Sequence, residues 1–179
     1  VGSSIWHGVG STKDGFAVRF SDSTRGTCVR MFDNAGNPTT TNLVLAALTG
    51  FAQAGGGGRG DSVGFHGNGK DAYVHACDYN VGGFGGFWVT VLNTNGTVRW
   101  TRDVSDDMAI LAGRVGRGDA AIDENGQVIV VFSSQIAGLA NSVTLGRRFD
   151  ASGNPMGGTF YLSEKEVPNL STPQLASAN

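Results

Sequence analysis

The sequence predicts an all-β protein made of three antiparallel four-stranded repeats. Three observations predict it: a composition rich in glycine and poor in proline, apolar strands that recur at one period, and similar turns that recur at nearly the same period. Of the 179 residues, 29 are glycine and 4 are proline, so glycine is about twice as frequent as in an average protein. Because glycine tolerates a positive φ, it suits the tight turns between short strands. This composition favours many turns over a disordered linker.

A short apolar strand recurs with its central valine at Val18, Val74 and Val130, which are 56 residues apart in each case. A second strand ends each time in a turn whose glycines are spaced by 60 and 57 residues: Gly36, Gly96 and Gly153. The sequence Gly-Arg-Gly-Asp occurs twice, at Gly58–Asp61 and at Gly116–Asp119, with a spacing of 58. Three markers that share one period indicate an internal repeat.

Each repeat divides into four expected strands separated by Gly and Asn turns. Alternation is clear in the strand around Val18, where Phe16 and Phe20 share its face. Short strands at such spacing predict an antiparallel meander, and four of them have the size of one β-propeller blade. The expected strands are Ser4–Val9, Phe16–Ser21, Thr27–Phe32 and Thr41–Ala46, then Ser62–His66, Ala72–Cys77, Phe87–Leu92 and Thr97–Asp103, and finally Ala120–Asp123, Gln127–Ser133, Val143–Phe149 and Gly158–Leu162.

These strands predict three blades over residues 1–50, 51–110 and 111–165. We expect the blade cores to be built by eight residues: Val18, Phe20, Val29, Val74, Trp88, Val130, Phe132 and Phe149.

Residues 166–179 remain after the third blade. Within them Gln174–Ala178 lies where the first strand of a fourth repeat is expected. A blade cannot bury both of its faces alone, and closed rings usually need at least about four blades. Three interpretations stay open: the chain is a fragment of a longer propeller, two copies form a six-bladed ring, or the extra strand adds to a neighbouring subunit.

The third repeat carries a resemblance to a known family. Arg147–Leu162 resembles the "RFDASG-P-GG-F-V" blade repeat of large secreted bacterial propeller-like proteins, and Asp123–Phe132 resembles the "D-DG-FVVVW" segment of the same repeat. Arg30–Pro38 matches in the first repeat, whereas the second repeat departs at Leu92–Gly96 and Trp100. The resemblance implies an exported, often cell-surface β-propeller, with no particular activity because such repeats are scaffolds.

Charge and hydropathy exclude two classes of partner. The net charge is −2 and no basic stripe is present, so we expect no nucleic-acid ligand. No apolar run approaches the roughly 18 to 20 residues that span a bilayer, so we expect no membrane span. Val1–Ser4 has no start Met and no apolar signal region, which predicts a processing boundary.

Two cysteines, Cys28 and Cys77, lie 49 positions apart and form no metal-binding motif. A disulfide between them would suit an exported protein. The alternative is two small, half-buried thiols within strands.

His7 and His66 occupy similar contexts, Trp-His-Gly and Phe-His-Gly. Side chains at one level of two blades can face a shared central channel, so the pair is a candidate binding site; the alternative is a residue inherited by duplication near a hairpin. Phe84 lies in the glycine-rich segment Val81–Phe87. An aromatic ring beside glycines can stack on a sugar ring or pack on the neighbouring blade.

Arg59, Asp61, Arg117 and Asp119 belong to the two Gly-Arg-Gly-Asp sequences. These contain the tripeptide that integrins recognise, which suggests adhesion. The structural alternative is that each arginine pairs with a carboxylate of the adjoining blade, while the glycines let the chain cross between blades.

Two catalytic motifs are missing from the sequence: there is no HExxH and no P-loop. We therefore assign no catalytic residue and no cofactor. Calcium stays an alternative at the turns Asp33–Gly36, Asn93–Gly96 and Asp150–Gly153, although they lack the alternating acidic ligands of known calcium loops and read more simply as Asx turns.

Together these features predict a non-enzymatic extracellular structural or recognition module. Its ligand would be a glycan or a protein, bound by loops on one face of the ring, and its self-assembly would use the C-terminal strand. The alternative is a fragment of a propeller hydrolase that acts on polysaccharide through paired carboxylates.

Overall fold

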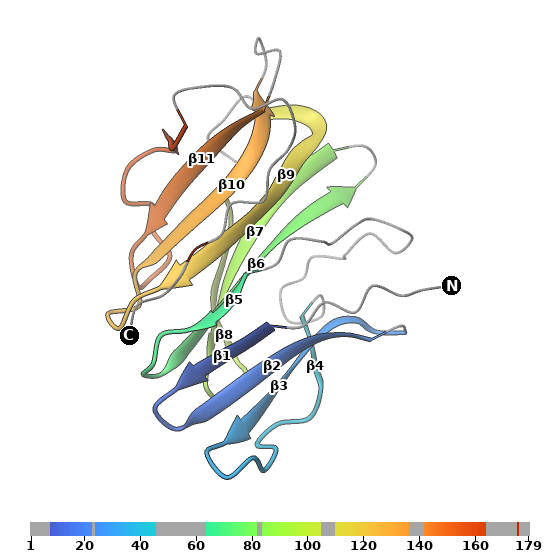
Figure 1. Cartoon of the computed structure of the whole chain (residues 1–179), viewed down its shortest axis with the longest axis vertical. Coiled ribbons are helices and arrows are strands. Elements are labelled where there is room, and N and C mark those ends of the chain that lie inside the picture. Colours follow the sequence, from blue (N-terminus) through green and yellow to red (C-terminus); the bar gives the residue numbers. More distant parts are fainter. Residues whose placement is uncertain are drawn as a thin grey trace.

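The computed structural model describes residues 8–22, 24–45, 64–81, 84–104, 110–136, 142–163 and 175; at 21, 78–81, 84, 85, 110–117, 135 and 136 it describes the backbone alone. Within these ranges the chain forms β-strands and no long helix (Figure 1). The strands are β1 (Gly8–Thr12), β2 (Gly15–Asp22), β3 (Gly26–Asp33), β4 (Leu43–Val44), β5 (Phe65–Gly67), β6 (Ala72–Val81), β7 (Phe84–Asn93), β8 (Val98–Asp103), β9 (Ile110–Ile122), β10 (Val128–Ile136), β11 (Ser142–Phe149) and β12 (Phe160–Tyr161).

The described strands form three antiparallel four-stranded sheets, one for each repeat. The N-terminal sheet has the order β1-β2-β3-β4, the middle sheet β5-β6-β7-β8 and the C-terminal sheet β9-β10-β11-β12. The first strands adjoin one another, since β1 lies against β5 and β5 lies against β9 (Figure 1). The predicted fold class is confirmed: the protein is all-β, with a propeller-like arrangement of blades.

The first strands approach closely because glycine lies at the contact. A Cβ built at Gly10 of β1 would lie 2.6 Å from the backbone nitrogen of Gly67 in β5, and one built at Gly67 would collide with the carbonyl oxygen of Ser11. Any larger residue at either position would push the two sheets apart.

Four turns close with the same pair of backbone hydrogen bonds. In each, the first residue donates its N–H to the carbonyl of the fifth, and the fourth residue, a glycine, donates back to the carbonyl of the first. The glycine φ angles are between 80° and 84°, a region that L side chains rarely adopt. The turns begin at Asp33, Asn93, Asp123 and Asp150.

The turn that begins at Asp150 in the C-terminal sheet docks on β8 of the middle sheet. The Trp100 indole Nε1 donates a hydrogen bond to the carbonyl of Ala151 at 3.1 Å, and the Arg102 Nε donates to the carbonyl of Gly153 at 2.8 Å. A Cβ at Gly153 would lie 2.6 Å from Cδ2 of Trp100, so the indole ring rests directly on the glycine.

The corresponding turn of the middle sheet docks on the N-terminal sheet in a similar way. A Cβ at Gly96 would collide with Cδ1 of Leu43 in β4 and would lie 3.6 Å from the sulfur of Met31 in β3. Each described sheet-to-sheet contact therefore includes a glycine turn seated on the outer strand of the preceding sheet.

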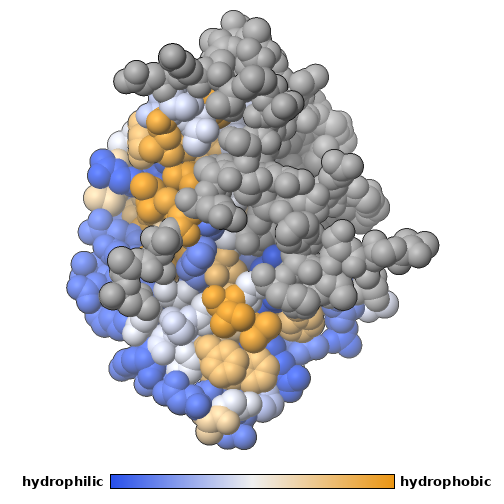
Figure 2. Space-filling model, in the orientation of Figure 1, coloured by the Kyte–Doolittle hydropathy of each residue, from blue (hydrophilic) through white to orange (hydrophobic). Residues whose placement is uncertain are grey.

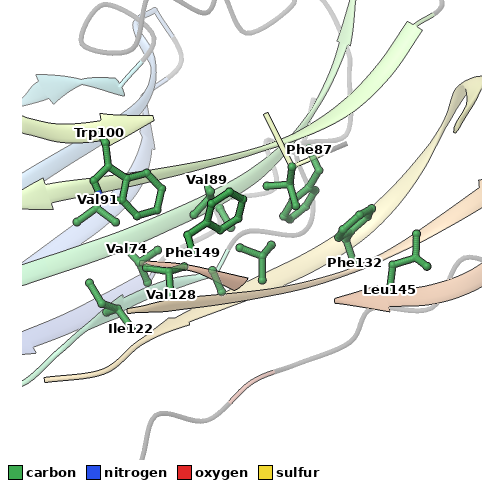
Figure 3. Close-up of a cluster of buried hydrophobic side chains, with 14 of the residues drawn as sticks. Val74, Phe87, Val89, Val91, Trp100, Ile122, Val128, Phe132, Leu145 and Phe149 are labelled. Carbon is green, nitrogen blue, oxygen red and sulfur yellow. The ribbon is translucent and has the colours of Figure 1, made fainter. Parts of the chain in front are cut away.

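The larger hydrophobic core lies between the middle and C-terminal sheets (Figure 3). Phe87 and Phe132 stack across it with ring centroids 5.6 Å apart, and Trp100 packs on Phe149 at 5.7 Å. A smaller core lies between the N-terminal and middle sheets and contains Ala17, Val29, Met31, Leu45, Phe65, Tyr73 and Leu92. Burial on both faces of the middle sheet makes it the central layer of the described molecule.

Three of the eight expected core residues, Val18, Phe20 and Trp88, are only partly buried. Val18 and Phe20 lie on the face of the N-terminal sheet that points away from the middle sheet, since their neighbours in β2, including Ala17, point toward it. The other five expected core residues are buried, each less than 2% exposed.

Two strand boundaries also differ from expectation. β1 covers Gly8–Thr12 and so runs past the expected end at Val9 to a tight turn, where Thr12 pairs directly with Gly15. Residues 4–7 of the expected strand lie outside the described residues. β9 starts at Ile110, ten residues before the expected start at Ala120. The segment Gly116–Asp119 therefore lies in a strand, not in a crossing between blades.

The structure holds Cys28 and Cys77 as thiols rather than as the disulfide considered from the sequence. Cys28 pairs with Phe20 and shares its face, which points away from the middle sheet where Cys77 lies in β6. Burial raises the pKa of the Cys28 thiol.

Among the described residues, no helix has the length and apolar character that crossing a membrane requires.

Candidate functional site

The candidate site lies where the first strands of the middle and C-terminal sheets meet. Oδ1 of Asp119 in β9 is 3.2 Å from Nε2 of His66 in β5 and accepts a hydrogen bond from the backbone N–H of Ala120 at 2.8 Å. Oδ2 of the same carboxylate accepts the backbone N–H of Leu175 at 2.9 Å. Asp119 thus joins β5, β9 and Leu175.

Glycine makes this contact sterically feasible. A Cβ at Gly64 would collide with Oδ1 of Asp119, so a side chain there would displace the carboxylate from His66. The side chain of Asp119 is 10% exposed and that of His66 is 28% exposed. The carboxylate is therefore nearly enclosed, while part of the imidazole reaches solvent.

A carboxylate next to an imidazole fixes the orientation of the ring. Such a pair can anchor a polar ligand through the exposed part of the ring. General-base catalysis would also need a nucleophile or a bound water placed by other groups. In the part of the chain that the structure describes, no three His, Cys, Asp or Glu side chains are grouped so that they could hold a metal ion.

The structure brings together two of the residues singled out from the sequence, His66 and Asp119. His7, Arg59 and Asp61 lie outside the described residues, so the shared channel of His7 and His66 stays a prediction. Phe84 is the first residue of β7 and pairs with Val81 in β6.

Arg117 lies within β9, where only its backbone is described. The described contact of this segment with the adjoining blade is made by Asp119 with His66, and the contact expected of the arginine stays a prediction. No pattern in the sequence pairs these two residues, because they belong to different repeats and their partnership depends on how two sheets are packed.

His75, in β6, is a packed residue. Its side chain contacts the Phe65 ring edge-on with centroids 6.4 Å apart, and only 3% of the residue is exposed. Burial, together with the positive charge of Arg19, holds the pKa of His75 well below its usual 6.5. The imidazole is therefore neutral at neutral pH and lies apart from the candidate site.

The acidic turns use their carboxylates to hold the backbone. Oδ1 of Asp33 accepts the N–H groups of Ala35 and Asn37, and Oδ2 accepts the Asn37 side-chain amide at 3.0 Å. Asp150 makes the same three bonds to Ser152 and Asn154. These hydrogen bonds, above all those from the Asn side chains, lower the pKa of both carboxyl groups. The geometry is that of Asx turns.

The sequence matches no protein-family model, and a search of the curated proteins found no match. Inference about function therefore depends on the fold and on the contacts described above.

Proposed function

We propose that this chain is a non-enzymatic extracellular module of a β-propeller, which serves in structure or in recognition of a glycan or protein. The observation that carries the proposal is the use of the repeat's carboxylates. Those of Asp33 and Asp150 close turns, and that of Asp119 holds three segments together. Acidic side chains committed to backbone hydrogen bonds are poorly placed to act on a substrate.

The recognition surface of this module would include His66. Its ring is partly exposed and is held by a nearly enclosed carboxylate, an arrangement that gives a polar ligand an oriented partner. The first strands of propeller blades line a central channel, so a ligand at His66 would enter along that channel. Export is implied by the resemblance of the third repeat to secreted propeller-like proteins.

The alternative function is a polysaccharide hydrolase, because a carboxylate and an imidazole lie together at the candidate site. Glycoside hydrolysis by the usual mechanism needs two carboxyl groups about 5 to 9.5 Å apart across the bond that breaks. At the described site Asp119 supplies one such group, and its neighbour at 3.2 Å is the imidazole of His66.

Release of reducing sugar from chitin, cellulose and peptidoglycan distinguishes the two functions. We expect no release above blank by the wild-type chain, and no difference between it and the isosteric Asp119→Asn variant. Release that disappears in Asp119→Asn would refute the non-enzymatic function. Co-sedimentation with the same polymers tests recognition, with His66→Ala expected to reduce any retention.

Localisation needs its own measurement. Fractionation of producing cells should place the chain in the medium or on the cell surface. Retention in the cytoplasm would contradict an extracellular role.

A further inference from the structure

The residue just before each turn is buried in the second and third repeats and only partly buried in the first. Leu92 precedes the turn at Asn93 and is fully buried against the N-terminal sheet, and Phe149 precedes the turn at Asp150 and is 1% exposed against the middle sheet. The equivalent residue of the first repeat, Phe32, is only partly buried. It stacks on Phe16 of its own sheet, with ring centroids 5.0 Å apart.

The turn glycines repeat this pattern. Gly96 and Gly153 are seated on the outer strand of the preceding sheet, whereas a Cβ at Gly36 would meet no atom within 4 Å. On the equivalent surface of the N-terminal sheet Val9 and Gly36 are exposed, whereas the phenylalanines and Val18 are partly buried. We call this surface the entry face, and its residues are Val9, Phe16, Val18, Phe20, Phe32 and Gly36.

The C-terminal sheet presents the matching half of the contact. Leu43, on which the Gly96 turn is seated, pairs with Val29, four positions before the turn at Asp33. Phe160 pairs with Gly146, which is likewise four positions before the turn at Asp150. We call the surface of Ile129, Phe160 and Leu162 the exit face, since the alternate residues of β10 and β11 are buried against the middle sheet.

Both faces carry exposed apolar groups. Val9 is 62% exposed and Leu162 is 48% exposed. Figure 2 shows apolar surface over the N-terminal sheet and over the C-terminal sheet on the same side of the molecule. Large side chains left in water at two such places favour association.

We propose that the entry face of one chain docks on the exit face of a second copy, with its Gly36 turn seated beside Phe160. The contact continues the two sheet-to-sheet interfaces within the chain, so its chemistry is already present in the molecule. Because both faces point to one side, two copies related by a two-fold axis satisfy both contacts at once and close a ring of six sheets. The inference rests on the proposed module function and adds its assembly.

The position of Leu175 is compatible with this docking. Its N–H binds Asp119 on β9, the first strand of the C-terminal sheet, whereas the exit face includes β12 at the opposite edge. The Gly36 turn would dock at the outer strand, at the other edge of the sheet from Leu175, whereas β1 of the second copy would come to β9 beside Leu175 if the contact of β5 with β9 is repeated between the chains.

Light scattering on a sizing column, over a wide range of concentration, tests the proposal. The wild-type chain should have a mass near 37 kDa, twice its 18.5 kDa. Val9→Glu on the entry face and Leu162→Glu on the exit face should each raise the dissociation constant of the dimer by about tenfold or more. A constant mass of 18.5 kDa for the wild type would overturn the proposal.

Mixing provides the sharper test. Val9→Glu retains an intact exit face and Leu162→Glu an intact entry face. In an equimolar mixture the mixed dimer therefore has one contact free of substitutions, which neither homodimer has, and it should dissociate less readily than either homodimer. A matched control is Tyr161→Glu, since Tyr161 is 57% exposed on the same strand but pairs with Leu145, whose side chain points to the opposite face. It should dimerise like the wild type. Circular dichroism should show that all three variants keep the β-fold.

Two outcomes would refute head-to-tail docking. One is an unchanged dimer in both face variants with loss of dimer in Leu175→Pro, which would indicate strand donation by the C-terminal segment. The other is a mixture that stays monomeric. Mass is independent of the sugar-release assay, so an enzymatic result would refute the proposed function and leave this inference standing.

Discussion

The docking of the Gly153 turn on Trp100 predicts different costs for the same substitution in two equivalent turns. Gly36 and Gly153 have nearly the same φ, +84° and +80°, so an alanine at either position carries a similar left-handed strain of about 1 to 2 kcal/mol. At Gly36 a Cβ meets no atom within 4 Å, whereas at Gly153 it lies 2.6, 2.8 and 3.0 Å from three atoms of the indole ring.

The indole cannot easily move, because Trp100 donates a hydrogen bond to Ala151 and packs on Phe149. Forcing an extra methyl group into such a contact costs about 1 to 3 kcal/mol. We therefore expect Gly153→Ala to lose about 1 to 3 kcal/mol more unfolding free energy than Gly36→Ala, which corresponds to roughly 2 to 4 °C of melting temperature per kcal/mol.

Urea unfolding followed by circular dichroism measures this difference. Both substitutions should be made in the Leu162→Glu background, so that dimerisation through the Gly36 turn does not contribute. Equal losses in the two variants would show that the Gly153 turn is not seated tightly on Trp100, and the reasoning about turn docking would fail with it.

Three other predictions follow from buried or hydrogen-bonded groups. Phe132→Ala removes a fully buried ring that stacks on Phe87 and should cost about 3 to 5 kcal/mol in urea unfolding, whereas Val9→Ala at an exposed position should cost little. Hydrogen bonds lower the folded-state pKa of Asp150 below 3.8, so the contribution of its carboxylate to stability is present above pH 3.8 and disappears as the pH falls through the folded pKa. Asp150→Asn should therefore flatten the acid limb of a stability-versus-pH curve. An unchanged limb would contradict the role of the turn carboxylate. The folded-state pKa of His75 lies well below 6.5. Below pH 6.5 the unfolded chain therefore binds a proton that the folded chain does not, and the free energy of unfolding decreases. His75→Gln should remove that decrease, and a decrease that persists in the variant would belong to another group.

The repeat, the number of sheets and most of the core could be predicted from the sequence because they depend on local alternation. Val74 and Val130 are buried, as the pattern of β6 and β10 requires. Val18 has the same local pattern and is only partly buried, because its burial depends on a further sheet and not on its own strand. Periodicity tells which residues share a face; it does not tell whether a partner covers that face.

The candidate site was only half predictable, for a related reason. The two Gly-Arg-Gly-Asp sequences suggest that Asp61 and Asp119 are equivalent. Counted from the turns, however, Asp119 lies four residues before Asp123, and the residue four positions before the corresponding Asn68 of the middle repeat is Gly64. The sequence echo is thus out of step with the turns. The contact of Asp119 with His66 arises because Gly64 leaves space for a carboxylate from the next sheet.

The unequal size of the two inter-sheet cores has a consequence for the order in which the molecule comes apart. Proteins built from stacked repeats lose structure at their weakest boundary first. The boundary between the N-terminal and middle sheets has the smaller core and also encloses the neutral His75. Amide hydrogen exchange should therefore be faster in β2 and β3 than in β7 and β10, and mild acid should widen that gap by protonating the imidazole when the boundary opens.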